Sequence, residues 1–185
     1  MDKKKFLILA FTLMAFAQLY VPFSMVWESE SILAKGTPYR FRTAPIDPND
    51  PFRGKYITLN FKDNICNIAN DSIWSQGDKA YGILENVNGF ASIRSLQKSK
   101  PENKDYLYLT ISYIVTVGNE NKANLVFPFD KYYMEESKAY AAEKIYRERQ
   151  LDTIHTTYAL VYVKNGVGRL SDVKIGDSSI RDMLK

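Results

Sequence analysis

The 22 consecutive residues 6–27 carry no charge, and this run limits the possible folds more than any other feature of the sequence. As an α-helix rising about 1.5 Å per residue, the run would be about 33 Å long, which matches the roughly 30 Å hydrocarbon core of a bilayer. Buried helices in soluble domains are usually shorter than this. Residues 6–27 therefore predict a transmembrane anchor whose partner is the lipid bilayer.

The charges around this run predict its orientation. Three lysines at residues 3–5 precede it, and Glu28 and Glu30 follow it. Because basic residues are retained on the cytoplasmic side of a membrane, we expect a cytoplasmic N-terminus and a single crossing. The chain then divides into a basic flank with its anchor, residues 1–27, and one extracytoplasmic domain, residues 28–185.

A cleaved signal peptide is the alternative interpretation of the N-terminus. The sequence Ala15-Phe16-Ala17 has the A-x-A form of a cleavage site and follows a short apolar stretch. The run stays apolar beyond Ala17, however, and Tyr20 and Trp27 lie where interfacial aromatic residues anchor a transmembrane helix. Both interpretations place residues 28–185 on the extracytoplasmic side of the membrane.

Three polar residues interrupt the apolar run: Thr12, Gln18 and Ser24. Small and polar residues are common where transmembrane helices touch one another. One hypothesis is therefore that these three mark a face of the anchor that contacts another helix.

The composition predicts a folded, strand-rich domain and excludes several classes of function. Hydrophobic residues make up 45% of the chain, and 13 Tyr and 10 Phe favour strands. The single cysteine, Cys66, and the single histidine, His155, exclude an internal disulfide and a Cys/His zinc site. Much of the net charge of +4 comes from the lysines at 3–5, so the sequence does not predict nucleic-acid binding. No cofactor is expected.

Alternation of apolar and polar residues predicts six to nine strands, and one helix interrupts them. Within the strand at 106–117, Tyr113 and Val115 are expected on the same face as Leu109 and Ile111. Asn165-Gly166 predicts a type I′ turn. We expect a mainly β, α+β domain, an antiparallel sandwich or barrel, with strands at 39–43, 56–61, 79–84, 90–94, 106–117, 123–127, 156–163 and 168–173 and a helix at 134–150.

Residues 47–61 join a charged loop to an alternating strand. Two prolines stiffen the loop, and Asp47 and Asp50 can accept hydrogen bonds or pair with Arg53. One hypothesis is a rigid turn latched by an Arg–Asp pair. The other is a binding site in which Asp47, Asp50, Arg53 and Tyr56 hold a ligand. A calcium loop needs more oxygen ligands than this segment offers, so no metal site is expected.

The same segment resembles the signature of the GDYXXLXY family of bacterial membrane-anchored proteins. The resemblance includes the order of anchor, Leu33-x-x-Gly36 and signature, and it continues in Phe127-Pro128, in Tyr132-Tyr133 with the acidic residues after it, and in residues 159–166. Lys55 stands where the family has its name-giving Asp, and Phe61 replaces the final Tyr. The matching positions read Pro45-x-Asp47-Pro48-x-Asp50-Pro51-Phe52-Arg53-Gly54-x-Tyr56-x-x-Leu59-x-Phe61.

The resemblance implies a protein of the bacterial cytoplasmic membrane whose molecular function is unknown and whose partner is a polytopic membrane protein. Because Lys55 is not an acid, a catalytic or metal-binding role for that position is not expected here. We therefore predict an interaction or accessory domain outside the membrane, working with an integral membrane partner.

A cell-envelope hydrolase, peptidase-like or glycosidase-like, is the alternative function. A catalytic triad would have to use His155, and a serine–lysine dyad would have to use Ser24, which lies inside the apolar run. Paired carboxylates at 135, 136 and 143 lie in the predicted helix, where solvated charge is the simpler interpretation. Cys66 is expected to be a buried apolar residue. No catalytic residue is predicted.

Overall fold

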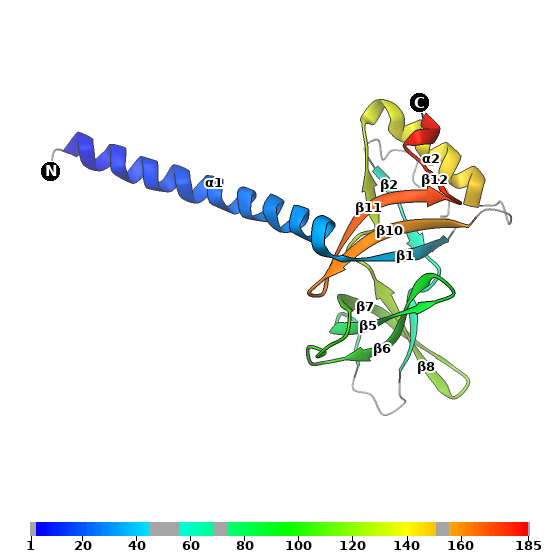
Figure 1. Cartoon of the computed structure of the whole chain (residues 1–185). Coiled ribbons are helices and arrows are strands. Elements are labelled where there is room, and N and C mark those ends of the chain that lie inside the picture. Colours follow the sequence, from blue (N-terminus) through cyan, green and yellow to red (C-terminus); the bar gives the residue numbers. More distant parts are fainter. Residues whose placement is uncertain (1–2, 45–55, 69–73, 151–155, 185) are drawn as a thin grey trace.

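The computed structural model describes residues 3–44, 56–68, 74–150 and 156–184. A single long helix, α1 (Lys3–Lys35), extends away from a β domain that contains the rest of the described chain (Figure 1). This helix is long and apolar enough to cross a membrane, and its most apolar stretch has no buried residue. The candidate membrane helix predicted at 6–27 is thus present.

The helix continues past the uncharged run and packs against the β domain. Residues 28–35 add about 12 Å of helix to the run. In this last part Ile32 is only 3% exposed, and Ser31 accepts a 3.0 Å hydrogen bond from the Nζ of Lys164. The amide of Gly36 then donates to the carbonyl of Ile32 at 2.8 Å, which closes the final turn. The helix therefore enters the domain without a free linker.

One antiparallel sheet receives the helix. It has the order β12-β11-β10-β1-β3, so β1, which follows α1 directly, lies between β10 and β3. Its strands are β1 (Thr37–Ala44), β3 (Asn60–Phe61), β10 (Thr157–Lys164), β11 (Val167–Ile175) and β12 (Ser178–Ser179).

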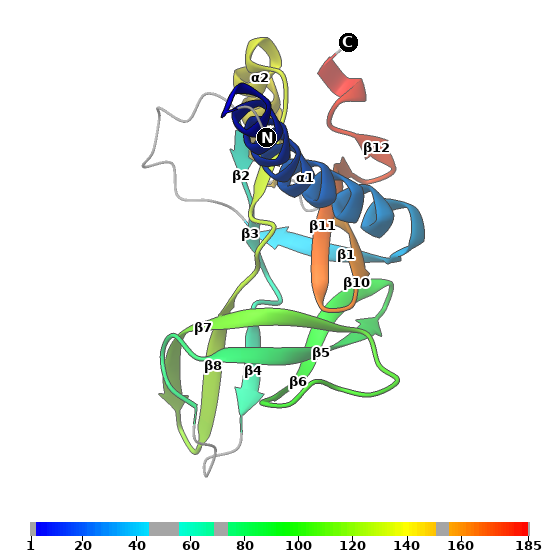
Figure 2. The ribbon, with the colours of Figure 1, turned by 90° about the vertical axis from the view of Figure 1, so that its left-hand side faces the viewer.

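A second antiparallel sheet, with the order β4-β8-β7-β5-β6, lies below the first when the molecule is viewed along α1 (Figure 2). Its two outer strands, β4 and β6, approach each other, so the sheet nearly closes into a barrel. Its strands are β4 (Ile65–Ile68), β5 (Lys79–Val87), β6 (Phe90–Gln97), β7 (Tyr106–Val117) and β8 (Glu120–Val126).

A short strand pair and a helix complete the domain. Strand β2 (Tyr56–Thr58) pairs with β9 (Lys131–Tyr133), and α2 (Glu136–Gln150) packs on β2 and β10 with Ala142 and Tyr146 fully buried. A 3₁₀ turn, η1 (Asp182–Leu184), ends the described chain beside α2. The prediction of a mainly β, barrel-like α+β domain after a membrane helix is confirmed.

Four phenylalanines fill the space where the two sheets meet. Phe41 of β1, Phe61 of β3, Phe127 and Phe129 are all buried, and their ring centroids lie 5.1–6.1 Å apart. Tilted and edge-on contacts at these distances are the favourable arrangements for aromatic rings. We call these four residues the aromatic joint, because they connect strands of both sheets.

Both Asn-Gly turns take the conformation that type I′ hairpins require. Asn165 and Gly166 have φ of 52° and 84°, and Asn88 and Gly89 have φ of 53° and 85°. The second turn is tight because β5 continues to Val87, three residues beyond the strand end expected at residue 84.

The predicted faces of β7 are wrong beyond its midpoint. The register with β8 shifts between Ile111 and Tyr113, so Ser112 is an extra residue in a bulge. Tyr113 and Val115 consequently point to solvent, whereas Leu109 and Ile111 point into the barrel.

Candidate functional site

The structure describes one of the four predicted binding residues. Asp47, Asp50 and Arg53 lie in residues 45–55, outside the described residues, so the choice between a latch and a ligand site stays open. Tyr56 begins β2 and is half-buried.

Tyr56 contributes to a small aromatic and cationic surface. Its ring lies 5.4 Å from that of its cross-strand neighbour Tyr133, which is exposed, and the Nζ of Lys131 lies 5.3 Å from its centroid. Cation–π contacts at exposed sites contribute about 0.5–1 kcal/mol. The arrangement orders the surface of the β2–β9 pair.

The strand that contains Tyr56 changes partner at Leu59. Its first half pairs with β9, its second half pairs with β1, and between them the amide of Leu59 donates to the carbonyl of Asp130 at 2.7 Å. Leu59 and Phe61 are buried, and Phe61 belongs to the aromatic joint. The described half of the signature thus connects the β2–β9 pair to the first sheet.

The sequence matches the family described as GDYXXLXY protein over residues 18–173, from within α1 to β11. The chain belongs to the GDYXXLXY family. Comparison with curated proteins and with solved structures found no match. The suspected family membership is confirmed.

The residues of this GDYXXLXY member that resemble the signature have mainly a packing role where the structure describes them. Leu59 and Phe61 lie in the core, while Tyr56 is half-buried at the surface. Two other segments of the resemblance meet the same region, because Tyr132 and Tyr133 of β9 pair with the signature strand and Phe127 packs against Phe61.

A partly buried polar cluster lies on the inner side of β9. Tyr132 donates to Oδ1 of Asp172 at 2.9 Å, and the hydroxyl of Ser179 and the amide of Val173 donate to the same oxygen at 2.9 Å. The guanidinium of Arg181 lies 5.1 Å from the Tyr132 ring. Burial and, secondly, the Asp172 carboxylate raise the pKa of Tyr132 well above its ordinary value. The cluster connects β9 to β11 and β12.

A bidentate ion pair that the sequence did not predict connects the two sheets. Nε and Nη2 of Arg42 donate to the two carboxylate oxygens of Asp63 at 3.0 and 3.1 Å, and the guanidinium lies 5.3 Å from the ring of Phe90. The sequence offered only two hints of this pair: an arginine on an alternating strand and an aspartate just after the signature strand. Without the pairing of β1 and β3, the sequence does not show that Arg42 and Asp63 lie close together.

The described residues favour none of the catalytic arrangements considered from the sequence. Ser24 donates its hydroxyl proton to the carbonyl of Val21 within α1, and His155 lies outside the described residues. Cys66 is buried, and burial, followed by the charge of Glu85, raises the pKa of its thiol to about 11. The part of the chain that the structure describes contains no group of three metal-binding side chains.

An exposed apolar surface on the barrel is the feature that sequence reasoning missed. The cross-strand register places Ile65 and Tyr113 on either side of Asn124, all facing outward. Because of the bulge at Ser112, Tyr113 and Val115 point outward on the same side as Tyr108, with Thr110 between them. We call this surface the outer patch; its members are Ile65, Tyr108, Tyr113, Val115, Val117 and Val126, all large apolar side chains exposed by more than a third.

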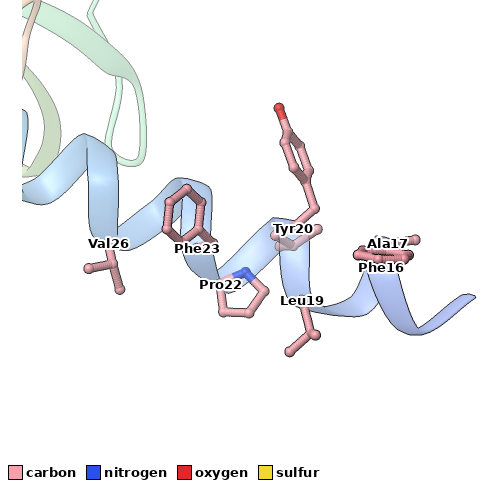
Figure 3. A pocket seen from close by; sticks show the side chains of 8 residues that line it. Phe16, Ala17, Leu19, Tyr20, Pro22, Phe23 and Val26 are labelled. Atoms are coloured by element: carbon pink, nitrogen blue, oxygen red, sulfur yellow. The ribbon is translucent and has the colours of Figure 1, made fainter. Parts of the chain in front are cut away.

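A shallow apolar groove follows α1, and all of its lining residues belong to that helix. Figure 3 shows Leu19, Pro22 and Val26 pointing to one side, with Tyr20 pointing to the other. Pro22 lies inside the helix, where it removes one main-chain N–H. In a membrane this groove faces lipid or another helix.

Proposed function

We propose that this GDYXXLXY member is a single-pass accessory protein of the bacterial cytoplasmic membrane. In this proposal the N-terminus is cytoplasmic, and the β domain lies on the extracytoplasmic side and binds an integral membrane partner. The positive-inside distribution of the flanking charges supports the orientation.

The outer patch is the observation that carries this proposal. Large apolar side chains cluster there on three adjacent strands, whereas isolated exposed apolar residues are normal on any surface. Polar side chains of β8 lie among them, because Asn124 is between Ile65 and Tyr113 and Lys122 is opposite Val115. Protein-binding surfaces commonly combine exposed apolar side chains with polar ones.

The junction between α1 and the domain supports a partner that is itself in the membrane. The helix reaches the domain without a flexible linker, about 12 Å beyond the uncharged run. A domain held this close to the bilayer meets surfaces near the membrane far more often than soluble proteins at a distance. The β7–β8 hairpin of the outer patch points away from the side to which α1 extends (Figure 1), so the proposed partner needs a part outside the membrane that reaches this hairpin.

Crosslinking in native membranes tests this proposal. Val115→Asp places a charge in the outer patch, and Val87→Asp places the same charge on the β5–β6 hairpin; both valines are 43% exposed. We expect the full-length chain and Val87→Asp to crosslink to the same integral membrane protein, identified by mass spectrometry. Val115→Asp should lose at least 80% of that crosslink while keeping its melting temperature.

Two results would overturn the proposal. One is an unchanged crosslink in Val115→Asp, which would mean that the outer patch is not the binding surface. The other is the absence of any specific membrane protein among the crosslinks of the unchanged chain.

A further inference from the structure

Gln18 places a polar amide close to the centre of the apolar run. The midpoint of residues 6–27 falls between residues 16 and 17, so Gln18 lies about 2 Å from it along the helix axis. Its side chain is exposed, and no part of the described β domain covers this stretch of α1. The hydrocarbon core offers no hydrogen-bond partner, so the amide is unfavourable there unless another polypeptide supplies one.

The other two polar residues of the run do not share this need. The hydroxyl of Thr12 donates to the carbonyl of Ile8 at 2.8 Å, and that of Ser24 donates to the carbonyl of Val21 at 2.8 Å. Residues 12, 18 and 24 are six apart, which spaces them about 120° around the helix. They therefore cannot form one contact face, and Gln18 alone requires an outside partner.

Pro22 removes the usual main-chain donor for a second group at the same place. In an α-helix the carbonyl of Gln18 accepts from the N–H of residue 22, and proline has none. The Gln18 position therefore presents a main-chain acceptor together with a side chain that both donates and accepts.

Apolar residues continue the Gln18 face along the helix at intervals of four and three. This is the spacing of a seam that packs against a second helix with knobs in holes, and one polar residue in such a seam fixes its register. The seam consists of Leu7, Phe11, Met14, Gln18, Val21 and Met25, all of them exposed.

We propose that α1 pairs in parallel with the α1 of a second copy of this chain through this seam. A primary amide is complementary to itself, because the N–H of one copy can donate to the oxygen of the other. Two copies inserted with the same orientation place their Gln18 residues at the same depth, so the amides meet across a two-fold axis. The pairing leaves the outer patch free for the partner of the proposed function.

The face of α1 opposite Gln18 provides a matched control position. Phe23 lies about 140° around the helix from Gln18, and Phe23 and Met25 lie at nearly the same depth. The groove on α1 does not separate the two faces, because Val21 of the seam lines it together with Phe23.

Disulfide formation in membranes tests the pairing. The full-length chain carries either Met25→Cys or Phe23→Cys, is oxidised briefly, and is quenched with maleimide before denaturation, so that buried Cys66 does not react. We expect at least fivefold more covalent dimer from Met25→Cys than from Phe23→Cys. Gln18→Leu should reduce the Met25→Cys dimer to the level of Phe23→Cys, and Gln18→Asn should preserve it.

Three results would overturn the pairing: equal dimer from both positions, a Met25→Cys dimer that Gln18→Leu does not reduce, or capture of a different membrane protein in place of a second copy. The last result would assign the Gln18 face to another protein's helix. The Val115→Asp crosslinking experiment is read independently, so failure of the pairing does not decide the proposed function.

Discussion

At the residue scale, the family signature separates into buried and exposed positions. Ile57, Leu59 and Phe61 point into the core, and Tyr56 faces the surface, as the alternation in the sequence predicted. The aromatic joint explains why an aromatic residue at position 61 matters for the fold: its ring touches three other rings from two sheets.

Phe61→Ala should destabilise the domain strongly. Removing a buried phenylalanine from a packed cluster usually costs about 3–5 kcal/mol. Tyr56→Ala, on the same strand but at the surface, should cost about 1 kcal/mol. Guanidinium unfolding of the full-length chain in detergent measures both, and equal losses for the two variants would contradict this assignment of core and surface.

The raised thiol pKa of Cys66 predicts that the free energy of unfolding declines in the alkaline range. Burial and Glu85 raise the thiol pKa from 9.0 to about 11 in the folded chain. The unfolded chain therefore releases this proton first, so the contribution is complete below pH 9 and is lost as the pH rises to about 11. Cys66→Ala should lose less stability than the unchanged chain between pH 9 and 11 in unfolding titrations. Parallel curves would show that the thiol does not titrate in this way.

At the element scale, local patterns predicted most strands, the helix at 134–150 and the Asn165-Gly166 turn. They could not predict the bulge at Ser112. An inserted residue moves every later side chain of the strand to the opposite face, but the alternation of apolar and polar residues in the sequence gives no sign of it. Short strands such as β4 and β9 were also not predicted, because pairing with other strands defines them and their few residues carry no clear alternation. The Arg42–Asp63 pair was missed for the same reason.

The four predicted binding residues show a different limit of prediction from sequence. Asp47, Asp50 and Arg53 lie outside the described residues, so only Tyr56 of that group has a described environment. A charged, proline-rich loop specifies stiffness through its backbone restrictions but does not specify which groups its carboxylates meet. The outer patch, by contrast, needed the barrel to bring residues of three strands together.

Gly36 should be essential for the junction between α1 and β1. A Cβ at this position would lie 2.5 Å from the carbonyl oxygen of Ile32 and 3.1 Å from that of Val163, both main-chain atoms. Gly36→Ala should therefore cost about 1–3 kcal/mol, the usual range for overpacking. Unfolding of the full-length chain measures it, with Lys35→Ala as the exposed neighbouring control. A neutral Gly36→Ala would indicate that the last turn of α1 adjusts freely.

At the scale of the whole molecule, α1 and the β domain are joined without a flexible linker. The Lys164–Ser31 hydrogen bond and buried Ile32 attach the end of α1 to β10 and β11, so the end of the helix moves together with the first sheet. A partner that binds the outer patch and a second copy that binds α1 would therefore each constrain the position of the other.

The side of the membrane on which the β domain lies is the central claim. It is tested by labelling single cysteines with a membrane-impermeant maleimide in spheroplasts of an expressing bacterial host. Val117→Cys, at the exposed tip of the β7–β8 hairpin, should be labelled in intact spheroplasts, and Lys4→Cys only after lysis; buried Cys66 should stay unlabelled in both. Labelling of Lys4→Cys in intact spheroplasts, with Val117→Cys protected until lysis, would contradict the account.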